Sequence, residues 1–188
     1  MSDVRELHGR ALASFGRLVH AVRPEQWGAP TPCRDWDVRA LVNHLVVEQL
    51  WVPEMLAGRT VAEVGDRFDG DQLGDDPVAA WDRAVEGVLA AVAEPGALTR
   101  TVHLSYGDVP AEHYCAEMTW DATVHSWDLA RAIGADDRLD PSLVEFALSV
   151  VEAQAAQLAA SGLFDPPIDV PADADQQTRL LALVGRRA

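Results

Sequence analysis

The chain has 188 residues and a formal net charge of −15, and its 48% hydrophobic and 24% charged residues fit one folded domain over residues 1–188. The acidic field repels phosphate backbones, and no apolar stretch reaches the ~18 residues that cross a bilayer, so we expect neither a nucleic-acid nor a membrane partner. Cys33 and Cys115 are too few for a disulfide framework, and the start lacks a signal-peptide pattern, so we expect a cytoplasmic protein with reduced thiols.

Helical periodicity is clear in the first third of the chain. The first predicted helix runs from about 4 to 22. The second begins near Val38, with Asp35 or Asp37 as its N-cap, and is apolar on most of its sides, as a buried helix is. Because proline lacks a backbone donor, we expect Pro53 to kink or break this helix.

The middle of the chain alternates loops with a strongly periodic helix. A Gly- and Asp-rich loop at 58–76 is long enough to be a lid or binding loop, or simply a covering loop. Apolar residues with helical spacing predict a third helix from Val78 to Val92. The segment LTRTVHLSYGD then reads as extended, with a turn at 107–108.

Three further helices complete the prediction. Pro110 fits the start of a fourth helix that ends at Gly134, and its apolar stripe includes Cys115 and His125. A fifth helix is predicted over 141–162 and a short last one over 176–184. The expected fold class is therefore all-α, a four-helix bundle with a short extra C-terminal segment.

The segment EMTWDATVHSWD carries the strongest functional signal. Asp121 and His125 stand four residues apart, which places both side chains on one face of a helix. His44 lies within another apolar helix. Two imidazoles and a carboxylate suit a divalent ion such as zinc, nickel or ferrous iron. A buried hydrogen-bonded network of the same three side chains is the competing interpretation.

Other polar residues near the motif leave alternatives open. Glu48 and Glu117 lie one helical turn from His44 and Asp121, where each is a candidate fourth ligand or general base as well as an ordinary surface residue. Asp128 follows His125 by three residues and is a candidate to orient its imidazole.

The chain also resembles a known family. The matching segments cover nearly its whole length in order: TPCRDWDVRALVNHLVVEQLWVPEMLAG, VGDRFDGDQLGDDP, TVHLSYGDVPAEHY, DATVHSWDLARAIG and FDPPIDVPADADQQTRLLALVGRR. They resemble actinobacterial metal-binding proteins related to the N-terminal domain of mycothiol-dependent maleylpyruvate isomerase, in the DinB/YfiT-like superfamily. The resemblance implies a metal triad of His44, Asp121 and His125.

The resemblance further implies a divalent metal, usually zinc, and mycothiol or another low-molecular-weight thiol as cosubstrate. The isomerase has glutamate where this chain has Asp121, and it carries an extra C-terminal domain, whereas this chain ends at Ala188. The implied chemistry is therefore that of the superfamily rather than isomerisation of maleylpyruvate.

Two functional hypotheses follow. The first is a metal-dependent thiol S-transferase or isomerase-like enzyme acting on a small electrophile, with the 27–33 segment and the 58–76 loop lining the pocket. The second is a non-catalytic, stress-related metal-binding bundle. Arg34 and Arg39 are candidates to hold the thiol cosubstrate, and a homodimer through helix faces is a further expectation.

Overall fold

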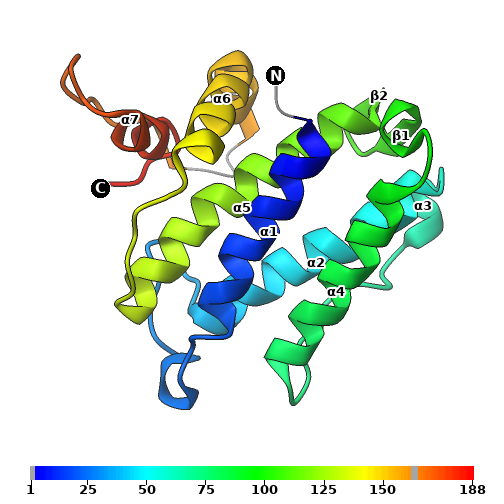
Figure 1. The fold of residues 1–188 in the computed structure, drawn as a ribbon, viewed down its shortest axis with the longest axis horizontal. Coiled ribbons are helices and arrows are strands. Elements are labelled where there is room, and N and C mark those ends of the chain that lie inside the picture. Colours follow the sequence, from blue (N-terminus) through cyan, green and yellow to red (C-terminus); the bar gives the residue numbers. More distant parts are fainter. Residues whose placement is uncertain (1–2, 162–164) are drawn as a thin grey trace.

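Four helices form the body of the molecule in a computed structural model that describes residues 3–161 and 165–188. They are α1 (Val4–Val19), α2 (Val38–Leu56), α4 (Pro77–Ala93) and α5 (Ala111–Ile133). Helix α1 packs along α5 and α2 packs along α4, and contacts of α2 with α5 and of α1 with α4 close the bundle (Figure 1). The predicted all-α class and four-helix architecture are confirmed.

Shorter elements connect and extend this bundle. They are η1 (Pro24–Gln26), α3 (Val61–Val64), η2 (Ala97–Thr99), the antiparallel strands β1 (Thr101–Leu104) and β2 (Gly107–Pro110), α6 (Pro141–Ser161) and α7 (Gln176–Leu183). Helices α6 and α7 pack against each other, and α6 lies against α5 outside the four-helix body (Figure 1). Among the described residues, no helix is both long and apolar enough to cross a membrane.

Local chemistry explains where the helices begin and end. Asp37 accepts a hydrogen bond from the amide of Ala40 at 2.8 Å, which caps α2 and selects Asp37 over Asp35 as the N-cap. Helix α5 ends at Gly134, whose φ of 70° is the left-handed conformation that glycine adopts without strain.

Two sequence predictions about element ends were wrong, and for Pro53 the structure excludes a break in the helix. Helix α1 ends at Val19, because the amides of Ala21 and Val22 bond three residues back in tighter turns. Helix α2 passes through Pro53 to Leu56, because the missing donor removes one hydrogen bond in what is already the last turn. The hairpin turn lies at 105–106, where Leu104 pairs with Gly107, rather than at 107–108.

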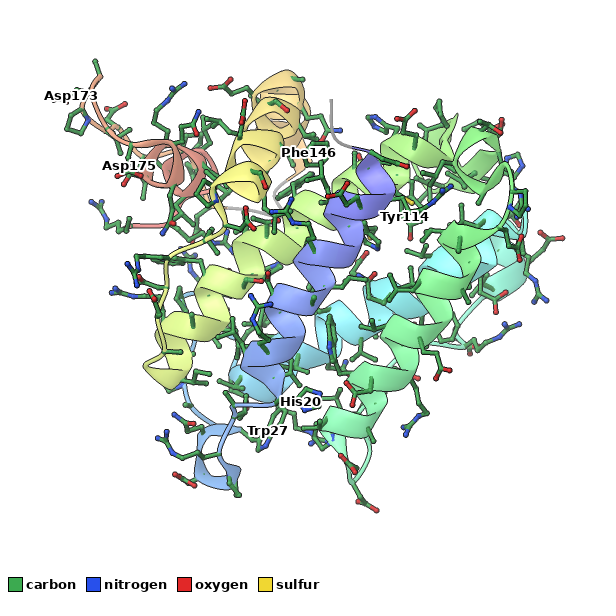
Figure 2. All side chains as sticks on the ribbon, in the orientation of Figure 1. His20, Trp27, Tyr114, Phe146, Asp173 and Asp175 are labelled. Atoms are coloured by element: carbon green, nitrogen blue, oxygen red, sulfur yellow. The ribbon has the colours of Figure 1, made fainter. Side chains whose placement is uncertain are left out.

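Helix α5 is buried on two sides, which is why its whole central stretch is protected from solvent. One side joins the main core of α1, α2 and α4, where the rings of Phe15 and Trp81 lie 4.8 Å apart. On the other side, Trp120 and Trp127 of α5 pack against apolar residues of α6 and α7. Side chains fill the spaces between the ribbons in Figure 2. Polar residues on α5 are consequently held in a protected setting.

Candidate metal site and its cavity

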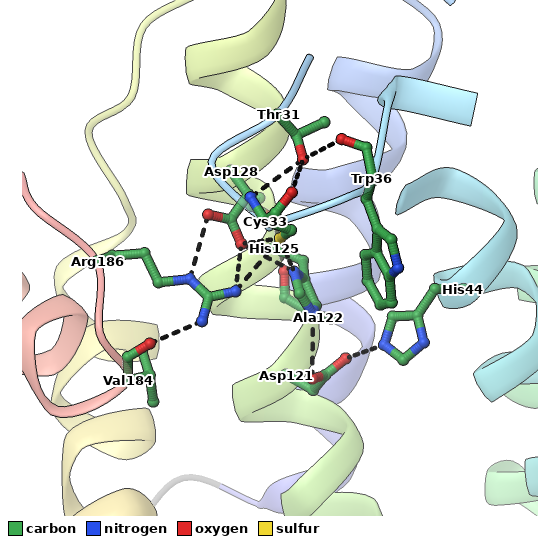
Figure 3. A network of polar contacts seen from close by, with 11 residues as sticks. Thr31, Cys33, Trp36, His44, Asp121, Ala122, His125, Asp128, Val184 and Arg186 are labelled. Atoms are coloured by element: carbon green, nitrogen blue, oxygen red, sulfur yellow. Dashed lines mark hydrogen bonds and ion pairs between the residues drawn. The ribbon is translucent and has the colours of Figure 1, made fainter. Parts of the chain in front are cut away.

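Adjacent helices α2 and α5 bring three predicted ligands together. The carboxylate of Asp121 lies between two imidazoles, with Oδ2 3.3 Å from Nε2 of His44 and Oδ1 3.4 Å from Nε2 of His125 (Figure 3). Asp121 and His125 are buried, whereas His44 is partly exposed. One ligand atom from each residue can be chosen so that all three lie within 4.8 Å of one another.

These separations fit a small divalent ion. Zinc–nitrogen and zinc–oxygen bonds of 2.0–2.2 Å in a tetrahedron place neighbouring donors about 3.3 Å apart. The distances from the Asp121 carboxylate to the two imidazoles, 3.3 Å from Oδ2 to His44 and 3.4 Å from Oδ1 to His125, are of that size. Because the donors are two imidazole nitrogens and a carboxylate oxygen, the set also accommodates nickel or ferrous iron.

Charges within the triad reinforce one another. Burial disfavours ionisation of Asp121, but the charge on His125 and hydrogen bonds from both imidazoles outweigh it and hold the pKa of Asp121 well below its usual range. Burial likewise disfavours the imidazolium of His125, but Asp121 outweighs it and raises the pKa of His125 well above its usual value. A metal ion at this position would therefore displace a proton from His125.

The other ring nitrogen of His125 is also engaged. Nδ1 lies 2.9 Å from Oδ2 of Asp128, which is fully buried. Arg186, from the segment after α7, donates to Oδ2 of Asp128 from Nη2 at 3.0 Å and to Oδ1 from Nε at 3.3 Å (Figure 3). A carboxylate behind a ligating imidazole fixes its tautomer and orientation, so Asp128 stands where such an orienting group belongs.

Cys33 joins this second set of contacts. Its Sγ donates to Asp128 at 3.2 Å and receives a hydrogen bond from Nη2 of Arg186 at 3.3 Å. Cys33, His125 and Asp128 are therefore a second group whose ligand atoms lie close together. Because the guanidinium of Arg186 already neutralises Asp128, a second cation there would face repulsion, which favours the triad with His44 as the metal site.

Two residues at the site were missed in the sequence. The ring centroid of Trp36 lies 4.9 Å from that of His44 and 6.0 Å from that of His125, so Trp36 packs beside both imidazoles. Trp36 precedes α2 in an irregular segment with no periodicity to reveal its direction. Arg186 reaches Asp128 only through the docking of α7, which no sequence spacing reveals.

The triad lies in the wall of a cavity of about 850 Å³. Aromatic side chains make up much of the lining, namely Trp36, Trp51, Tyr106, Tyr114 and Trp120. The predicted contribution of the segment before α2 is seen in Pro32 and Cys33, at the end of that segment, and in the adjoining Arg34. The 58–76 loop supplies only Val61, because most of it lies elsewhere: Asn43 donates to the carbonyl of Gly70 at 3.0 Å.

Glu48 and Glu117 both line this cavity. Burial is the main reason that the pKa of Glu48 is raised to about 7, with the nearby His44 opposing the shift and Asp121 adding to it. Glu117 accepts a hydrogen bond from the hydroxyl of Tyr106, at the hairpin turn, and another from Nε2 of Gln154 at 3.3 Å. Neither glutamate belongs to a metal-ligand group among the residues described.

The two arginines considered as holders of the thiol are both paired. Arg34 lines the cavity and forms an ion pair with Asp165 at 3.0 Å. Arg39 points to the covering loop, where it pairs with Asp71 at 2.6 Å.

Comparison with known proteins places this chain in a family. The family description "Mycothiol maleylpyruvate isomerase N-terminal domain" matches residues 8–130, a stretch that contains His44, Asp121 and His125. Two uncharacterized proteins from two strains of Mycobacterium tuberculosis are each 34% identical over 146 residues, which is 78% of this chain and 76% of theirs.

Solved structures agree on the fold. The crystal structure of the mycothiol-dependent maleylpyruvate isomerase and that of a histidine-to-alanine mutant each superpose with a TM-score of 0.63, at 16% and 14% identity. Each match covers 83% of this chain and 68% of the other. The chain belongs to the family of the mycothiol maleylpyruvate isomerase N-terminal domain, with the DinB-like helical fold.

Proposed function

We propose that this protein binds one divalent metal ion, zinc in the first place, through His44, Asp121 and His125, and uses it in a mycothiol-dependent transferase or isomerase-like reaction. The observation that carries this proposal is the convergence of three donor atoms at metal-ligand separations in the wall of a large cavity. Catalytic zinc sites use three protein ligands and keep a position for water or substrate, and this donor set has that composition.

The chain's own residues have distinct roles in this proposal. A bound divalent ion would lower the pKa of a coordinated thiol and favour the nucleophilic thiolate. Asp128 holds His125 through Nδ1, so that Nε2 faces the metal position. Trp36 packs beside both imidazoles.

The cavity favours an enzyme over a metal-binding protein without catalysis. Its volume of about 850 Å³ is that of a site for a small molecule, and its walls combine aromatic and aliphatic side chains with polar groups. A non-catalytic protein would keep the triad but would have no need of such a space.

Calorimetric titration of mycothiol into zinc-loaded and metal-free protein tests the proposal. We expect binding to the zinc-loaded protein alone, with a heat that varies with the ionisation enthalpy of the buffer, because the thiol binds as thiolate and releases a proton. The His44→Ala variant is the matched control and should behave like metal-free protein. Metal-independent binding, or no binding at millimolar thiol, would contradict the proposed function and favour the non-catalytic alternative.

A further inference from the structure

We propose that the acidic end of the cavity, which comprises Glu48, Glu117 and the hydroxyl of Tyr106, binds the ammonium group of a cationic electrophilic substrate. This inference rests on the proposed function, because it specifies the second substrate of the same site. It predicts that the cavity selects against electrophiles that carry a carboxylate.

The positive charges of the cavity are already engaged. The sequence has no lysine, so arginine is its only permanent cationic side chain. Among the described residues that line the cavity, the arginines are Arg34 and Arg186. Arg34 pairs with Asp165 at 3.0 Å and Arg186 with Asp128 at 3.0 Å. A carboxylate on a substrate would have to compete with these existing partners.

Unlike Asp165 and Asp128, the two glutamates have no arginine partner among the described residues. Glu48 has no hydrogen bond or ion pair within the described part of the chain, although its side chain lines the cavity. Glu117 is held by Tyr106 and Gln154, and its nearest basic group is the imidazole of His113, whose Nε2 is 3.4 Å from Oε1. Both glutamates therefore line the cavity, and neither forms an ion pair with an arginine of the described residues.

The remaining walls also suit a cation. Trp51, Tyr106, Tyr114 and Trp120 line the same cavity. The faces of such rings attract ammonium groups through their quadrupoles, and aromatic surfaces beside carboxylates are a common setting for organic cations. A substrate would then lie with its reacting carbon near the triad and its ammonium group at the acidic end.

Cys33 offers a way to measure this selectivity without metal or mycothiol. It lines the cavity, whereas the second cysteine, Cys115, is fully buried. Methanethiosulfonate reagents modify a thiolate in one step: the cysteine sulfur bonds to the reagent's thiol sulfur, and methanesulfinate leaves. The cationic trimethylammonium-ethyl reagent and the anionic sulfonatoethyl reagent differ mainly in charge. Arg186 and Asp128 both contact Cys33 and pair with each other, so the charges at the sulfur balance.

The measured quantity is the rate of modification of Cys33 by the cationic reagent divided by the rate with the anionic reagent, on metal-free protein. We expect this ratio to be at least ~10-fold higher than the same ratio measured for 2-mercaptoethanol. Glu48→Gln and Glu117→Gln should each lower that ratio, and together they should remove most of it. Glu86→Gln, an exposed change on α4, is the matched control for net charge and should leave the ratio unchanged. Cys33→Ser should abolish modification.

An equal or inverted ratio in wild type, or a ratio that both glutamine variants leave intact, would overturn the inference. Circular dichroism of each variant checks the fold.

A second experiment compares mycothiol conjugation of monobromobimane with that of its trimethylammonium derivative on zinc-loaded protein. We expect kcat/KM to favour the cation at least ~10-fold. Charge selectivity at Cys33 without any conjugation would support the cation site and refute the proposed function. Conjugation without charge selectivity would support the proposed function and refute the cation site.

Discussion

Asp128 places Oδ2 2.9 Å from Nδ1 of His125, while Nε2 of the same imidazole faces Asp121 at 3.4 Å. The two carboxylates therefore engage opposite nitrogens of one ring. The contact with Asp128 favours a proton on Nδ1. The lone pair of Nε2 is then directed to the space between His125, Asp121 and His44. The position of Asp128 thus determines whether His125 can serve as a ligand in the triad.

Replacement of Asp128 by asparagine should weaken zinc binding by about 10- to 100-fold, because the amide keeps the size of the side chain but loses the charge that orients His125. Competition with a chromogenic chelator measures the dissociation constant. Asp82→Asn, which removes an exposed carboxylate near His20, is the control. An unchanged affinity in Asp128→Asn would mean that the contact does not support the ligand.

Cys33→Ser separates the two possible ligand groups. If the metal is held by His44, Asp121 and His125, loss of the sulfur should change zinc affinity by no more than about twofold, because the hydroxyl can still hydrogen-bond to Asp128. The same competition assay decides. Loss of metal from Cys33→Ser would instead assign the ion to the group of Cys33, His125 and Asp128.

Zinc affinity should rise with pH. In the metal-free protein, burial lowers the pKa of His125, but Asp121 outweighs this effect and raises it. The ion pair therefore stabilises the fold fully at pH values below the unfolded-state pKa of about 6.5. This stabilisation is lost as pH rises through the higher folded-state pKa. Zinc must displace that proton, so affinity should increase by up to about tenfold per pH unit below the folded pKa. A pH-independent dissociation constant between about pH 6 and pH 8 would contradict the charge assignment.

Much of the fold could be predicted from sequence because it rests on local patterns. Apolar periodicity found the four bundle helices, and Gly134 marked the end of α5 because that position requires a left-handed backbone. The spacing of Asp121 and His125 placed them on one face. The proximity of His44 depends on how α2 packs against α5; the residues alone raised it as a hypothesis, and the family resemblance strengthened it.

The remainder depends on tertiary contacts that no local pattern encodes. Arg186 and Asp128 are 58 residues apart in sequence and meet only because α7 docks against α6. The 58–76 loop was a candidate lid, but its polar backbone bonds to the outer side of α2 at residues such as Asn43. Pro53 was expected to kink or break α2, yet the helix continues to Leu56, because the position of Pro53 in the last turn makes the lost hydrogen bond tolerable.

A glycine pair tests the packing of the bundle. A Cβ at Gly16 would lie 2.7 Å from Nε1 of Trp81, so Gly16→Ala should destabilise the protein by about 1–3 kcal/mol despite the better helix propensity of alanine. Gly87→Ala, in α4 with nothing within 4 Å, should stabilise it by about 0.5–1 kcal/mol. Urea unfolding measures both. Equal effects of the two changes would show that α1 and α4 do not approach as closely as described.

The metal site itself is tested most directly by zinc content and affinity after purification without chelators and reconstitution with zinc. We expect one zinc ion per chain in wild type, loss of the metal in His44→Ala and His125→Ala, a smaller loss of affinity in Asp121→Asn, and full retention in His20→Ala, whose imidazole pairs with Asp82 at the surface. Wild-type protein that binds no zinc at micromolar concentrations, or triad variants that bind it as tightly as wild type, would contradict the proposed site.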